Sequence, residues 1–176
     1  YGSGDSTLTS LVNNGQINVY SSNSTAMKND YSGSTTIANS GTIHIYNNAV
    51  GSNVFGGNYS NAVNNGTIIY EATNSSSSSG SNATNLLNIK QNIMNTKSPS
   101  RTSSVTSSET ETITNSGTIT ITSADTSAMT VASKQGTATN TGTINLNSNG
   151  TNYSNTGMHL TSDAISVAKI VNQGTI

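Results

Sequence analysis

The side chains that could carry acid–base or metal chemistry in this chain are seven carboxylates and two histidines. Glycoside hydrolysis needs two opposed carboxylates, and lyase chemistry needs a basic residue beside metal-binding acids. Only Glu109 and Glu111 lie close together in the sequence, and their Ser/Thr-rich surroundings favour solvated charges over a catalytic pair. The other acids are scattered at Asp5, Asp30, Glu71, Asp125 and Asp163.

The two histidines, His44 and His159, are far apart in the sequence. His44 alternates with Ile43 and Ile45, which predicts an imidazole that points outward from a strand. A ligand role needs partners, and the sequence contains neither cysteine nor a Gly-Gly-x-Gly-x-Asp calcium repeat. We therefore predict that the protein is not an enzyme and that it has no catalytic, cofactor-binding or metal-binding residues.

Composition also limits the partners of the chain. The net charge is −1 with only six basic residues, which argues against binding to nucleic acid or to an anionic membrane, because both need a clustered positive field. No apolar run is long enough to span a membrane as a helix. Apolar residues make up only 31% of the chain, but they recur in register, which favours an ordered fold with a thin core.

A recurring motif, Asn-x-Gly-x-Ile, organises most of the sequence. Its asparagines are Asn13, Asn39, Asn64, Asn115, Asn140 and Asn172. Apolar residues lie two positions before each asparagine and, in the first five copies, two positions after each isoleucine, a pattern that predicts two short strands joined by a tight turn. Asparagine and glycine suit that turn because both tolerate a positive φ and because the asparagine amide can bond its own backbone.

The spacing of the motif predicts a solenoid. The motif glycines lie 26, 25, 51, 25 and 32 residues apart, whereas hairpin strands recur every 8–12 residues. The interval of 51 is close to two coils, so we expect a degenerate coil there, with Asn85 to Met94 as a strand. The interval of 32 is one coil plus a small loop. A third strand per coil is predicted at Ala26-Met27, Val54-Phe55, Ala128-Met129 and Gly157-Met158.

The predicted fold is therefore all-β: a right-handed parallel β-helix (β-solenoid) with about 25 residues per coil and roughly seven coils with extruded loops. Residues 1–176 are predicted to form a single solenoid segment, a fragment of a longer repeat protein. Residues 74–84 and 96–111 are the candidate surface loops, and 96–111 holds the only proline and the only arginine.

Two polar columns follow from this stacking. The motif asparagines are predicted to form a ladder in which side-chain amides bond along the axis. The threonines are predicted to face outward, at Thr42, Thr67, Thr118, Thr143 and Thr175. An ice-binding alternative arises from Thr118, Thr120 and Thr122, but His44 and Ile69 interrupt the equivalent column in other coils.

The motif, with Ala-Met or Gly-Met midway through the coil, resembles the passenger repeats of bacterial type V autotransporter adhesins, above all the asparagine-rich passengers of fusobacteria and their relatives. Filamentous haemagglutinins have similar coils. The resemblance covers roughly Leu11 to Tyr70 and Thr112 to Ile176. It implies an extracellular location on the bacterial cell surface and a rod that attaches or aggregates cells through its side loops.

Two functions are compatible with these expectations. In the first, the chain is an adhesin or rod segment whose loops contact a host or bacterial cell-surface protein or glycan. In the second, it is a structural subunit of an extracellular fibre, and its partners are other copies of itself stacked end to end.

Overall fold

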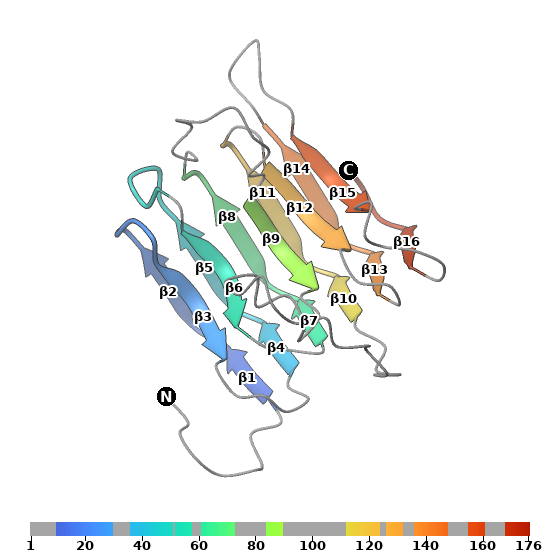
Figure 1. Ribbon diagram of the computed structural model, residues 1–176, viewed down its shortest axis with the longest axis horizontal. Helices are drawn as coiled ribbons and strands as arrows, with labels where there is room; N and C mark the ends of the chain where they lie inside the picture. The colour runs from blue at the N-terminus through green and yellow to red at the C-terminus, as the bar shows by residue number, and fades with distance from the viewer. Residues whose placement is uncertain are drawn as a thin grey trace, which may run out of the picture.

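The computed structural model describes residues 10–29, 36–50, 52–57, 61–72, 84–89, 112–123, 126–131, 136–147, 155–160 and 168–176. These residues form sixteen strands and no helix, so none of them belongs to a helix able to span a membrane. The pairings between the described strands are parallel, and strands that follow one another in the chain belong to different sheets, so the chain winds as a β-solenoid (Figure 1).

Three sides enclose a narrow core. The first sheet stacks β1 (Ser10–Asn13), β4 (Thr36–Asn39), β7 (Asn61–Asn64), β10 (Thr112–Asn115), β13 (Thr137–Asn140) and β16 (Lys169–Asn172). The second sheet stacks β2 (Gln16–Val19), β5 (Thr42–Ile45), β8 (Thr67–Tyr70), β11 (Thr118–Ile121) and β14 (Thr143–Leu146). The third side holds β3 (Thr25–Asn29) with β6 (Asn53–Gly57), and β9 (Thr84–Ile89) with β12 (Thr126–Val131) and β15 (Thr156–Leu160).

The predicted inward columns form the core. The motif isoleucines Ile43, Ile68, Ile119 and Ile144 are at most 1% exposed, because strand alternation turns them to the inside. The predicted third strands are confirmed as β3, β6, β12 and β15, and Met27, Phe55 and Met129 are buried. Burial of each such side chain is worth about 1.5–3 kcal/mol.

The interval of 51 residues is one coil, so the expectation of two coils is wrong. Strand β7 pairs directly with β10, which places Asn64 opposite Asn115. The Thr112 hydroxyl also lies 2.6 Å from Asn61 Oδ1 across the same pair. Strand β9 confirms the first part of the strand expected from Asn85 to Met94, and residues 90–94 lie outside the described residues. It is the third strand of that single coil, because it pairs with β12. The described strands form five triplets and the first strand of another, so roughly seven coils are not confirmed.

The asparagine ladder is present as predicted. The first five motif amides each donate from Nδ2 to Oδ1 of the asparagine in the next coil, over 2.8, 2.9, 2.7, 2.7 and 2.8 Å in chain order. All six asparagine amides also donate to the backbone carbonyl of the glycine two residues later, as Asn64 Nδ2 does to Gly66 at 3.3 Å. Asn39, Asn64, Asn115 and Asn140 are fully buried, and a buried amide needs these partners because an unpaired one costs about 1–3 kcal/mol.

The motif glycines are required for a different reason from the one expected. None has a φ in the left-handed range. Instead, a Cβ on Gly117 would lie 2.0 Å from the carbonyl oxygen of Gly66 in the preceding coil, and Gly41, Gly66, Gly142 and Gly174 show the same close approach. Coil-to-coil distance, not turn conformation, therefore excludes a side chain here.

Replacing Gly117 with alanine tests this reason. The added methyl would collide with backbone atoms of Asn65 and Gly66, which the ladder holds in place, so we expect a loss of about 3 kcal/mol, as for overpacked cores. The midpoint of thermal unfolding, followed by far-ultraviolet circular dichroism, should fall by roughly 10 °C.

Gly15→Ala is the matched control, because a Cβ at Gly15 would meet no atom within 4 Å. Its melting midpoint should stay within about 2 °C of the wild type. Equal losses in the two variants would show that the glycines serve the turn conformation after all.

Candidate functional site

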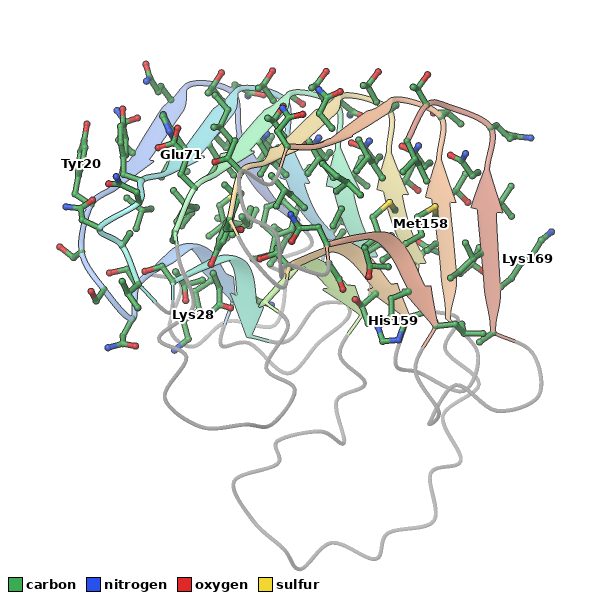
Figure 2. The ribbon with its side chains drawn as sticks, turned by 90° about the horizontal axis from the view of Figure 1, so that it is seen from above. Tyr20, Lys28, Glu71, Met158, His159 and Lys169 are labelled. Carbon is green, nitrogen blue, oxygen red and sulfur yellow. The ribbon has the colours of Figure 1, made fainter. Side chains whose placement is uncertain are left out.

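Of the residues singled out for chemistry, the structure describes three, and among these His44 lies beside Glu71 while His159 lies apart from both. Of the seven acids only Glu71 lies among the described residues; Asp5, Asp30, Glu109, Glu111, Asp125 and Asp163 lie outside them. His44 in β5 and His159 in β15 are on different sides of the solenoid, and Figure 2 shows His159 opposite Glu71. The predicted loops 74–84 and 96–111 also lie outside the described residues, apart from Thr84, which begins β9.

Coil stacking instead gathers a cluster that the motif did not indicate. Tyr20, Tyr46 and Glu71 each stand three residues after a motif isoleucine, just beyond the second strand of three successive coils. The backbone nitrogen of Tyr46 donates to the carbonyl of Val19 at 3.0 Å, and that of Glu71 donates to Ile45 at 2.9 Å, so the three positions are in register. With His44 they form what we call the aromatic cluster.

The rings of the aromatic cluster are stacked. Tyr20 and Tyr46 have centroids 4.3 Å apart and planes inclined by 21°, and His44 and Tyr46 have centroids 3.7 Å apart and planes inclined by 20°. Tyr20 remains 54% exposed. Such stacking fixes the rings and leaves one of them open to solvent.

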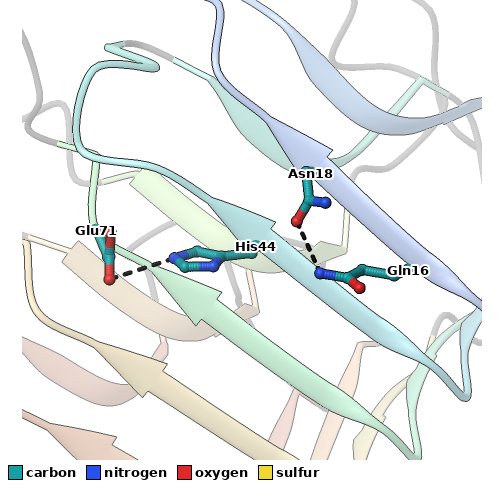
Figure 3. A network of polar contacts seen from close by, with 4 residues as sticks. All are labelled: Gln16, Asn18, His44 and Glu71. Carbon is teal, nitrogen blue, oxygen red and sulfur yellow. Dashed lines mark hydrogen bonds and ion pairs between the residues drawn. The ribbon is translucent and has the colours of Figure 1, made fainter.

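His44 and Glu71 connect neighbouring coils beside this stack. His44 Nε2 lies 3.2 Å from Glu71 Oε1, with the two side chains 18% and 34% exposed (Figure 3). The distance suits an ion pair when the imidazole is protonated, and Nε2 is buried and makes no hydrogen bond to any described residue. His44 faces outward as predicted, yet its neighbours partly cover it.

Side-chain amides continue the same face along β2. Gln16 Nε2 donates to Asn18 Oδ1 at 3.1 Å, and both residues are exposed (Figure 3). Gln16, Asn18 and Tyr20 alternate along the chain, so they share the outer face of the second sheet. The threonines at 42, 67, 118 and 143 lie on this face too, which confirms their predicted outward orientation.

The aromatic cluster has its own electrostatics. A hydrogen bond with the side chain of Tyr20 raises the pKa of Tyr46 above its ordinary value, and burial and the charges of Tyr20 and Glu71 act in the same direction. The neutral phenol is therefore favoured in the folded protein. This contribution to stability is present below the ordinary tyrosine pKa and is lost as the pH rises through the raised value.

The aromatic cluster combines two phenol rings, one imidazole and one carboxylate. Among the described residues, no three histidine or carboxylate side chains lie close enough to hold a metal ion. The cluster also brings together only one carboxylate. What it presents is a fixed aromatic ring beside uncharged amides.

Comparisons with known proteins name no relative: no family model matches the chain, and neither a curated protein nor a solved structure matches it.

Tyr20→Phe tests the electrostatics of the aromatic cluster. The phenyl ring can still stack on Tyr46, but the hydroxyl that contributes most to the shift is gone, so the pKa of Tyr46 should fall toward the ordinary value. Glu71→Gln should lower it less, because Glu71 is the smallest cause. Titration of ring-¹³C-labelled tyrosine by NMR measures both changes. An unchanged titration of Tyr46 in Tyr20→Phe would rule out the hydrogen bond as the main cause.

Proposed function

We propose that the protein is a segment of an extracellular rod, an adhesin of the bacterial cell surface with the organisation of an autotransporter passenger, that mediates attachment or aggregation. The observation that carries the proposal is the unbroken asparagine ladder across the interval of 51 residues. A scaffold that keeps its register while it accepts a long insertion can present binding segments without loss of stiffness.

The coil lengths support this distinction between a constant scaffold and inserted binding segments. Asn64 and Asn115 are 51 residues apart and Asn115 and Asn140 only 25, a difference of 26 residues, yet both ladder bonds measure 2.7 Å. The extra residues thus leave the scaffold geometry unchanged. They include the candidate loop 96–111, which we propose as a contact with a cell-surface protein or glycan.

We also propose that the solenoid is right-handed. The support is physical: the right-handed twist of strands makes right-handed crossovers between parallel strands strongly favoured. With Asn64 and Asn115 one coil apart, about 25 residues make the ordinary coil, and the longer coils carry insertions.

The proposal is tested by replacing residues 96–111 with a Gly/Ser segment of equal length. Beads coated with the wild type should attach to a panel of epithelial and bacterial cells, and the replaced protein should lose at least tenfold in attachment. Its melting midpoint should change by less than about 3 °C, because surface changes cost little.

The matched control replaces residues 148–154, which lie in the coil of 32 residues between Asn140 and Asn172. This variant should attach like the wild type. Full attachment after replacement of 96–111 would remove that loop as the contact, and no attachment by the wild type to any cell would contradict the adhesin function itself.

A second candidate is a structural subunit of an extracellular fibre. The direction of the ladder favours it, because every amide donates toward the next coil and copies of the chain would have to stack head to tail. Under this alternative, purified protein should form rods in electron micrographs, with a strand spacing of about 4.8 Å in fibre diffraction. Sedimentation as a strict monomer at high protein concentration would contradict it.

A further inference from the structure

We propose that Asn65 is a site of spontaneous deamidation that the stacked coils suppress, so that the reaction proceeds only in chains whose coils have separated there. The sequence contains Asn-Gly at residues 14–15, 65–66 and 149–150, and at Asn65 the structure describes a coil on either side, with β7 between β4 and β10. The inference goes beyond the proposed function, because it concerns a covalent change of the chain itself.

The chemistry needs only Asn65, Gly66 and water. The backbone nitrogen of Gly66 gives up its hydrogen and attacks Cγ of the Asn65 side chain. The new N–C bond closes a five-membered succinimide, and the Cγ–Nδ2 bond breaks, so that Nδ2 leaves with the hydrogen as ammonia. Water then opens the ring at either carbonyl, which gives aspartate or isoaspartate. Glycine favours ring closure because it has no side chain to shield the attacking nitrogen.

In the folded chain, the attacking nitrogen already donates a hydrogen bond. The backbone nitrogens of Asn65 and Gly66 both donate to the carbonyl of Asn39 in the preceding coil, at 2.8 and 3.1 Å. A backbone amide in such a bond exchanges its hydrogen with solvent only when the bond opens. Loss of the Gly66 hydrogen therefore requires this turn to separate from the coil before it.

The coil that follows holds the attacked side chain. Ser116 donates from Oγ to Asn65 Oδ1 at 2.6 Å, although both residues are exposed. The carbonyl of Gly66 accepts from the backbone nitrogen of Thr118 at 2.9 Å, and the buried amide of Asn64 donates to the same carbonyl at 3.3 Å. Ring closure has to turn the Asn65 side chain and the Gly66 peptide toward each other, so it breaks contacts with both neighbouring coils.

The two products differ in their fit to the coil. Aspartate keeps a side-chain oxygen that can accept the Ser116 hydroxyl, and a charged acceptor strengthens that bond. Asn65→Asp should therefore melt within about 2 °C of the wild type, and a larger loss would contradict this fit. Isoaspartate instead carries the main chain through the former side chain, which lengthens the link to Gly66 by one carbon atom. That change displaces Gly66 from Asn39 and Thr118, so isoaspartate opposes restacking of the coil.

The experiment follows Asn65 by peptide mass spectrometry while the full chain is incubated in mildly alkaline buffer, either folded or in urea. Electron-transfer fragmentation assigns the mass increase to residue 65 and distinguishes aspartate from isoaspartate. The unfolded chain should deamidate about a hundredfold faster than the folded chain, because a reaction that needs opening is slowed by the opening equilibrium. Similar rates in the two states, or no reaction at Asn65 in urea, would overturn the inference.

Two glycine variants place the same clash at different coils. In Gly117→Ala the added methyl presses on Gly66, including its backbone nitrogen, whereas in Gly174→Ala it presses on Gly142, two coils beyond Asn65. Each coil of a solenoid contacts only its neighbours. Folded Gly117→Ala should therefore deamidate at Asn65 about tenfold faster than the wild type, and Gly174→Ala at the wild-type rate. Equal acceleration by both variants would contradict control by the neighbouring coils.

Ser116→Ala makes the same test without a clash, in case Gly117→Ala does not fold. Loss of the hydroxyl frees Asn65 Oδ1, so deamidation of the folded protein should rise about threefold. Ser40→Ala is the matched control, because Ser40 stands at the same motif position in the coil before Asn65 and its hydroxyl makes no hydrogen bond to a described residue. It should react like the wild type. Equal rates in these two variants, both folded by circular dichroism, would contradict the protective role of the Ser116 bond.

Discussion

The close axial approach of neighbouring coils is the constraint on which the rest of the structure depends. Buried asparagine amides bond only if each coil lies within hydrogen-bond distance of the next, and at that distance the turn leaves no room for a Cβ beside the preceding glycine carbonyl. The contact between coils therefore explains why both asparagine and glycine are needed in the Asn-x-Gly sequence. A chain with few apolar residues can then remain ordered, because amide ladders and backbone pairing supplement a thin core.

The outward positions are free of this constraint, and the coils differ there. On the second sheet, the position three residues after the motif isoleucine holds Tyr20, Tyr46, Glu71 and Thr122 in successive coils. The scaffold places whatever stands at this position in one column. The stack of Tyr20 on Tyr46 and the approach of Glu71 to His44 are consequences of register, and they create a surface without any dedicated loop.

The packing inside the solenoid could be predicted from the sequence, because residues that recur once per coil occupy the same position in every coil and contact one another. The apolar columns, the asparagine ladder and the third strands with Met27 and Met129 all follow from the repeat. The interval of 51 could not be assigned by spacing, since two coils and one coil with an insertion have similar lengths, and only the pairing of Asn64 with Asn115 distinguishes them. The aromatic cluster was missed because Tyr20 and Tyr46 lie outside the motif and meet only through stacking.

The central claim, that β7 and β10 are adjacent coils across the interval of 51 residues, is tested most directly by a disulfide between Val63→Cys and Thr114→Cys. These outward residues are partners across the two strands, and the natural chain contains no cysteine to interfere. Adjacent strands place their Cα atoms about 4.8 Å apart, within disulfide range. Mild oxidation should link this pair, but not Val63→Cys with Thr139→Cys, which is one strand further along the sheet. Failure of the first pair to link in a folded protein would indicate an intervening coil, with Cα atoms about 10 Å apart, and would contradict the account.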